Sequence, residues 1–203
     1  MDREIIHNPI TGETLYVLES TAETFKFEFR LRPGGVVAGE HIHPTQQQTI
    51  TVLSGELHCQ AGKNQYVIRA DESVTIPPGM THSQWNPTNT EVFAIKELRP
   101  AGRFHHMFRT VFALARNGRT NAKGVPRPLI GAAFMAEFKD VIRPARLRHR
   151  LIFGLLAPLC RLLGYRQIIR NYITEFELNA ERGNLPKFRS SEGVRLEAKR
   201  ARA

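Results

Sequence analysis

Three histidines and one glutamine in the first half of the chain have the residue types and spacing of metal ligands. His41 and His43 are separated by one residue, and Gln48 follows five positions after His43. His82 comes later, shortly after a Pro-Pro-Gly turn. Side chains at i and i+2 of a strand point to the same face, so His41 and His43 can reach one ion together. A third imidazole from a neighbouring strand would complete a nitrogen ligand set that suits Fe, Mn, Ni, Cu or Zn.

Gln48 is the unusual member of this set because its carboxamide is neutral. Three imidazoles and Gln48 would leave the full charge of a divalent ion in place, which favours an anionic ligand such as an enolate or catecholate. We expect the affinity for metal to be about ten- to hundredfold below that of a carboxylate site. The alternative is a site that no longer binds metal. Gln84 lies two positions after His82, shares its strand face, and is the candidate for orienting a substrate.

The spacing of these residues resembles the two motifs of the cupin superfamily, G-x5-H-x-H-x3-4-E-x6-G and G-x5-P-x-G-x2-H-x3-N. The matching residues are Gly35, His41, His43 and Gly55, followed by Pro77, Gly79, His82 and Asn86. Gln48 stands where the family has its metal-binding glutamate, and Asp71 replaces the opening glycine of the second motif. The resemblance covers roughly the first half of the chain. It implies a β-barrel that holds a metal ion through the histidines.

The alternation of apolar and polar residues independently predicts an all-β unit. Residues 24–32 place Phe25, Phe27 and Phe29 on one face and charged residues on the other. After a turn-rich opening at 7–12, we predict strands at 13–18, 24–32, 46–53, 57–60, 65–69, 74–76, 81–85 and 91–98. Short strands at this spacing, separated by Gly and Pro turns, are typical of a sandwich or barrel. We therefore predict a mainly β fold, a cupin-like antiparallel β-barrel (double-stranded β-helix or jelly roll) over residues 1–100.

The hydrophobic period becomes helical after an Arg-Pro-Ala-Gly segment at 99–102. Apolar residues recur every three or four positions from Phe104 to Ala115. Two further helices are predicted at 129–142 and 147–163, the last ending at Gly164. We thus predict a helical extension of about three helices over residues 101–180. Residues 181–203 are predicted to form a basic, frayed tail.

The net charge of +10 is concentrated in the second half of the chain. Residues 1–100 contain eight Lys and Arg against twelve Asp and Glu, whereas residues 101–203 contain 21 against seven. The apolar run 151–160 is far shorter than the ~20 residues that span a bilayer. We expect the basic segment 143–170 to pack on its own barrel or to form a homodimer contact. Peripheral membrane contact is the next alternative, and nucleic-acid binding is the least favoured.

The two cysteines and the N-terminal residues indicate in which cellular compartment the protein works. Cys59 and Cys160 are far apart in sequence and lie in apolar surroundings, which indicates buried thiols in a reducing compartment. The first residues carry charges where a secretory signal would be apolar. We expect a cytoplasmic protein, and peripheral association with the membrane is the alternative.

These features favour a metal-dependent enzyme that acts on a small molecule. Dioxygenation of an enolisable, phenolic or otherwise apolar substrate, an oxidoreductase reaction, suits a histidine-rich site with open positions. Simple core packing is the favoured interpretation of Phe25, Phe27 and Phe29, and the alternative is that they supply an apolar wall to the site. No Gly-rich phosphate loop or Ser-His-Asp grouping is evident. The alternative function is a non-catalytic ligand-binding module whose basic helices mediate dimerisation or association with a membrane or partner.

Overall fold

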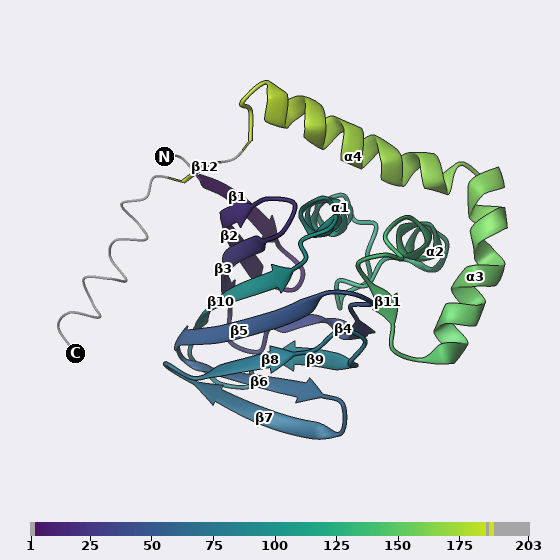
Figure 1. Ribbon diagram of the computed structural model, residues 1–203. Coiled ribbons are helices and arrows are strands. Elements are labelled where there is room, and N and C mark those ends of the chain that lie inside the picture. Colours follow the sequence, from purple (N-terminus) through teal and green to yellow (C-terminus); the bar gives the residue numbers. More distant parts are fainter. Residues whose placement is uncertain (1–2, 186, 189–203) are drawn as a thin grey trace.

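The computed structural model describes residues 3–185 and 187–188 and has a β-rich body followed by helices (Figure 1). The strands among these residues are β1 (Arg3–Asn8), β2 (Glu13–Ser20), β3 (Phe25–Leu31), β4 (Val36–Ile42), β5 (Gln47–Ser54), β6 (Glu56–Ala61), β7 (Asn64–Arg69), β8 (Ser73–Ile76), β9 (His82–Trp85), β10 (Val92–Arg99), β11 (Arg143–Pro144) and β12 (Lys187–Phe188). The helices are α1 (Phe104–Arg116), α2 (Pro128–Glu137), α3 (Leu147–Leu162) and α4 (Tyr165–Glu181).

The strands form two antiparallel sheets that share one core. Seven strands are ordered β12-β1-β2-β3-β10-β5-β8, and five are ordered β11-β4-β9-β6-β7. Buried apolar residues from both sheets and from the helices belong to a single cluster. The predicted cupin-like antiparallel β fold with an α extension is therefore confirmed.

β3 and β10 are neighbours in the larger sheet, and both alternate strictly between the core and the outer face. Phe25, Phe27 and Phe29 of β3 are fully buried, while the intervening residues are partly exposed on the outer face. The outer face is lined by ion pairs, of which Lys26 Nζ to Glu97 Oε2 at 3.4 Å is one. The three phenylalanines therefore belong to the core, which agrees with the interpretation of core packing and not with that of a wall of the site.

Turn residues of the two motifs have clear conformational roles. Gly55 and Gly79 have φ angles of 83° and 76°, a region that favours glycine. A Cβ atom on Gly55 would lie 2.7 Å from the carbonyl oxygen of Glu91. Asp71, which replaces the motif glycine, also adopts a positive φ of 67°, a conformation that aspartate tolerates better than most residues. Its backbone therefore follows the path that the glycine of the motif would allow.

The first two helices depart partly from their predicted ends. α1 begins at Phe104 as predicted, but α2 ends at Glu137 rather than at 142. Residues after Phe138 leave the helix because the chain turns there towards the histidines, and the Val141 carbonyl oxygen accepts a hydrogen bond from His43. The local hydrophobic pattern does not reveal this distant contact.

The described residues contain four helices where about three were expected, because a further helix follows the third. Gly164, with a φ of 77°, ends α3 and is also the residue that precedes α4. α4 packs against α1 and α2, so its apolar residues face other helices rather than the sheets. Beyond α4, Lys187 pairs with Glu4 in a short strand ladder. Most of the predicted tail, residues 189–203, lies outside the described residues.

The helices lie together at one end of the sheets, with α3 and α4 outermost (Figure 1). Arg109 of α1 is buried and forms an ion pair with Glu4 of β1. On α2, Glu137 pairs with three arginines, from the segment before α1 and from α4: Arg103, Arg166 and Arg170. Within the described residues, no single helix has the length and hydropathy to span a membrane; α3 and α4 meet that test only as a pair bent by 81°.

Candidate metal centre

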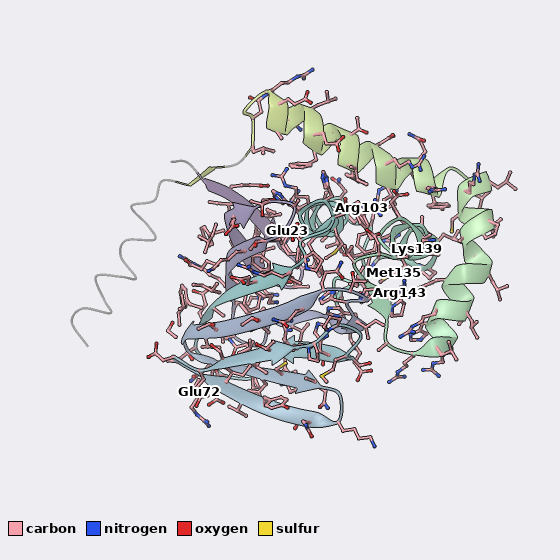
Figure 2. The ribbon with its side chains drawn as sticks, in the orientation of Figure 1. Glu23, Glu72, Arg103, Met135, Lys139 and Arg143 are labelled. Atoms are coloured by element: carbon pink, nitrogen blue, oxygen red, sulfur yellow. The ribbon has the colours of Figure 1, made fainter. Side chains whose placement is uncertain are left out.

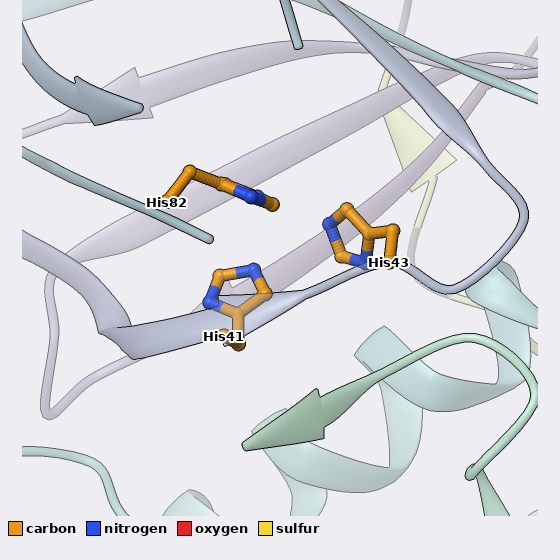
Figure 3. A group of neighbouring side chains, drawn as sticks. All are labelled: His41, His43 and His82. Atoms are coloured by element: carbon orange, nitrogen blue, oxygen red, sulfur yellow. The ribbon is translucent and has the colours of Figure 1, made fainter. Parts of the chain in front are cut away.

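The three predicted histidines come together at one end of the sheet interior (Figure 3). Their candidate ligand nitrogens all lie within 4.8 Å of one another, and all three residues are buried. The ring centroids of His41 and His82 are 4.4 Å apart, and that of His43 lies 4.9 Å and 4.8 Å from the other two. No other group of three or more His, Cys, Asp or Glu in the described part of the chain could hold an ion in this way.

Strand pairing and turn geometry bring the histidines together. His41 of β4 is the direct partner of His82 at the start of β9. The two motif turns are joined where the Gly79 amide donates a 2.7 Å hydrogen bond to the His43 carbonyl oxygen. Asn86 secures the other end of β9, because its side-chain amide donates to three carbonyl oxygens: those of Leu31, Arg32 and Thr90.

Each imidazole is oriented by a backbone carbonyl. The Nδ1 atoms of His41, His43 and His82 lie 2.8, 2.8 and 3.0 Å from the carbonyl oxygens of Gly39, Val141 and Met80, respectively. A carbonyl only accepts, so Nδ1 carries the proton and Nε2 keeps its lone pair. Such carbonyl contacts are the usual means of fixing the tautomer and orientation of metal-binding histidines. Consistent with this, His82 Nε2 is buried without a hydrogen-bond partner.

The histidines are neutral at physiological pH. Burial lowers the pKa of His43 to about 3, with further lowering by the charge of His82. Burial also lowers the pKa of His82 to about 4, and the pKa of His41 is lowered well below its usual value for the same reason. Metal binding would therefore require no loss of protons from these rings near pH 7.

The glutamines lie at the same site as the histidines. Gln48 of β5 is buried, and its side chain lies beside His43. Gln84 of β9 is buried as well, and its Oε1 accepts a 2.7 Å hydrogen bond from Lys96 Nζ. The side-chain Nε2 atoms of both glutamines are buried without a hydrogen-bond partner. Glu40 is exposed, as strand parity predicts, and lies 3.8 Å from Arg146 Nε.

Two charged residues of the site were not predicted from the sequence. Lys96 of β10 is only 1% exposed, and burial lowers its pKa to about 8. Glu13 of β2 is 2% exposed, and burial raises its pKa to about 7 despite the positive charge of Lys96. Lys96 Nζ also lies 4.3 Å from the centroid of the Phe29 ring, a cation–π contact. A buried lysine and glutamate with shifted pKa values are typical of functional sites.

A cavity of about 540 Å3 connects the histidines with the helices. Its polar floor is lined by Glu13, His41, His43, Gln48, Gln84 and Lys96. Its apolar wall is lined mainly by residues of α1, α2 and α3: Met107, Phe108, Val111, Phe112, Phe134, Met135 and Phe153. The volume lies in the range of small-molecule sites. The extension therefore packs on its own β domain, as expected, and forms much of the cavity wall.

A family comparison agrees with this geometry. Residues 27–95, which span both motifs, match the family model described as a cupin domain. The chain contains a cupin domain. A search of curated proteins found no match.

Several solved structures are similar to this cupin domain. A double-stranded β-helix protein from Klebsiella pneumoniae is 25% identical over 43% of this chain and 76% of its own, with a TM-score of 0.40. A sugar phosphate isomerase of the cupin superfamily from Silicibacter pomeroyi is 17% identical over 49% and 70%, with a TM-score of 0.43. An RmlC-like cupin from Shewanella frigidimarina is 22% identical over 48% and 85%, with a TM-score of 0.42.

The donor set of this cupin domain fits a divalent transition metal. Three neutral imidazoles with open Nε2 atoms suit Fe, Mn, Ni, Cu or Zn. Gln48 could add a neutral oxygen. The absence of a carboxylate among the candidate ligands distinguishes this site from the usual motif.

Replacing Gln48 with glutamate is expected to raise the affinity for a divalent metal by about ten- to hundredfold, since a carboxylate adds a negative charge to a neutral ligand set. Competition with a chromophoric chelator would measure the change. Gln47→Glu is the matched control, because Gln47 is exposed on the same strand. Equal affinities of Gln48→Glu and the unmodified protein would mean that Gln48 does not face the ion.

Proposed function

We propose that the protein is a metal-dependent enzyme that oxidises a small apolar molecule with an enolisable or phenolic head group, using dioxygen. The observation that carries this proposal is a buried cluster of three neutral imidazoles, two of which, His41 and His43, line a cavity with a largely apolar wall. When bound, the metal would supply Lewis-acid stabilisation of an anionic oxygen and a redox partner for dioxygen.

The charges of the cavity floor support an anionic head group. His41, His43, His82 and the two glutamines are uncharged near pH 7. Lys96, with a pKa of about 8, is mostly protonated at that pH, whereas Glu13, with a pKa of about 7, is ionised only in part. Its ammonium group would attract an enolate or phenolate in a cavity with a largely apolar wall.

Gln84 and Glu13 are suited to orient the substrate and to accept its proton. Lys96 fixes the Gln84 carboxamide through Oε1, which leaves the buried Nε2 to donate to a substrate oxygen. Glu13, with a pKa of about 7, exists in both protonation states near neutral pH. It can therefore take a proton from an enolisable carbon or a phenol, as a general base requires.

The apolar wall favours a substrate with a hydrophobic body. Phe108 and Phe112 of α1 and Phe134 of α2 line the cavity away from its polar floor. Burial of an aromatic or aliphatic group against these rings would place the polar head at Lys96 and the histidines. A densely hydroxylated sugar phosphate would leave many polar groups unpaired against this wall.

A ligand-binding role without catalysis is the second candidate. The observation that favours it is Gln48 at the position where the motif has a glutamate, because a neutral ligand set binds metal less firmly. In this case the cavity would hold its ligand through Lys96 and Gln84 alone.

Oxygen uptake separates the two functions. Protein loaded anaerobically with Fe(II) is expected to bind 4-nitrocatechol with a shift of its visible spectrum, and to consume dioxygen when mixed with an aromatic β-diketone or a catechol. Protein without metal is the control. The non-catalytic role would be favoured if 4-nitrocatechol binds equally with and without metal and if no dioxygen is consumed with either the β-diketone or the catechol.

A further inference from the structure

Helix α3 exposes an unusually apolar outer face. We define the leucine face as the exposed residues Leu147, Leu151, Ile152, Leu155, Leu159 and Leu162. Leu155 and Leu162 are 81% and 82% exposed. At 100° per residue these side chains share one side of the helix. Figure 2 shows side chains of α3 projecting away from the sheets.

The opposite side of α3 is anchored to the rest of the protein. Phe153 and Leu156 pack against the core, and Cys160 is fully buried. The Cys160 Sγ lies 3.1 Å from the carbonyl oxygen of Leu129 on α2. The leucine face is therefore presented by a fixed helix, and its exposure does not come from a loosely packed element.

Helix α3 and the residues just before it, which carry the leucine face, have charges of one sign, and the acidic residue that pairs with them is Glu40, which lies 3.8 Å from Arg146. Residues 141–174 contain seven arginines and no aspartate or glutamate. Of these, Arg143, Arg146, Arg148 and Arg161 are exposed on β11, on α3 or immediately before it. An apolar helical face flanked by arginines is the arrangement that lies in the interface of an anionic bilayer, where the apolar side chains are buried and the cations meet lipid phosphates.

Two other occupants match this surface less well. A symmetric contact between two copies would bring the same patch together, so that Arg148 and Arg161 of each copy would meet arginines with no acidic residue on the helix. The C-terminal residues 189–203 are also basic and contain only two large apolar residues, Val194 and Leu196. Neither supplies negative charge together with a large apolar area.

We propose that the leucine face of α3 docks the protein on an anionic phospholipid surface. The cavity adds a consequence, which rests on the proposed function. Arg146, His149 and Phe153 line the cavity, and the first two are exposed, so the mouth adjoins the first turns of α3, where the leucine face begins. A docked protein would take an amphiphilic substrate, with an apolar body and an enolisable or phenolic head, directly from the lipid.

Vesicle sedimentation tests the docking. The full chain is expected to sediment with vesicles of phosphatidylglycerol and phosphatidylcholine, to bind pure phosphatidylcholine much less, and to dissociate as salt is raised. Leu155→Ser/Leu162→Ser is expected to lower the partition coefficient by about tenfold or more, and Arg148→Gln/Arg161→Gln to remove the preference for anionic lipid. Val36→Ser/Val67→Ser is the matched control, because it removes two exposed apolar side chains from the sheets.

Two results would overturn the docking proposal. One is that the unmodified chain fails to sediment with anionic vesicles. The other is that the chain forms a dimer in analytical ultracentrifugation that Leu155→Ser/Leu162→Ser dissociates, which would make the leucine face a contact between copies. Neither measurement involves metal or turnover, so failure of docking and failure of the proposed function are distinguishable.

Discussion

His43→Ala is expected to lower the affinity for a divalent transition metal by at least about a hundredfold. Even residues that only orient metal ligands change affinity by about ten- to hundredfold, and His43 is one of three converging imidazoles. Titration of metal-free protein in competition with a chromophoric chelator would measure the loss. Fe(II)-dependent oxygen uptake should fall in parallel.

The control for this variant must separate metal binding from folding. Removal of the His43 ring leaves the Val141 carbonyl oxygen without its donor, which costs about 1–3 kcal/mol of stability. Thermal unfolding of the metal-free protein should therefore accompany each titration. His58→Ala is the matched variant, because His58 pairs with Glu56 on the outer face of β6. Unchanged metal affinity in folded His43→Ala would contradict the assignment of His43 as a ligand.

Lys96→Met is expected to weaken binding of 4-nitrocatechol to the metal-loaded protein by about ten- to hundredfold. A buried ammonium near an anionic oxygen contributes on the order of 1–3 kcal/mol in a partly screened site. Methionine keeps most of the volume and suits the surrounding phenylalanine rings. Because the variant leaves Gln84 Oε1 without its donor, thermal unfolding of the metal-free variant should accompany the binding measurement.

The measurements that identify this role are ligand affinity and the pH profile. The pKa of Glu13 should rise further when the positive charge of Lys96 is removed, so any activity that requires ionised Glu13 should move to higher pH. Lys26→Met is the matched control, because Lys26 is on the outer face of β3 and pairs with Glu97. Equal effects of Lys26→Met and Lys96→Met on probe binding would contradict a role for Lys96 at the site.

The motif residues could be placed from the sequence because their spacing encodes local geometry. An H-x-H pair on one strand face and a third histidine after a Gly turn need only two adjacent strands to converge. Lys96 could also have been found by the same reasoning. It shares strand parity with Val92, Ala94 and Leu98, which all face the core, and it is the charged exception among them. Glu13 stands in the same relation to Leu15 and Val17.

The contacts of the helical extension could not be found in this way. The hydrogen bond between His43 and Val141 joins residues 98 positions apart, and no periodicity specifies such a pair. Helix α4 was missed in the sequence because Gly164 was interpreted only as the end of α3, whereas it also precedes α4. The predicted division at residues 100 and 180, the homodimer and the cytoplasmic location stay predictions.

X-ray absorption on zinc-loaded protein tests the central claim most directly. The three converging imidazoles predict three histidine nitrogens at about 2.0–2.1 Å from the ion, with no sulfur neighbour. A spectrum with one histidine or none, or with a sulfur atom at about 2.3 Å such as Cys59 would supply, would contradict the metal centre and the enzymatic function that rests on it.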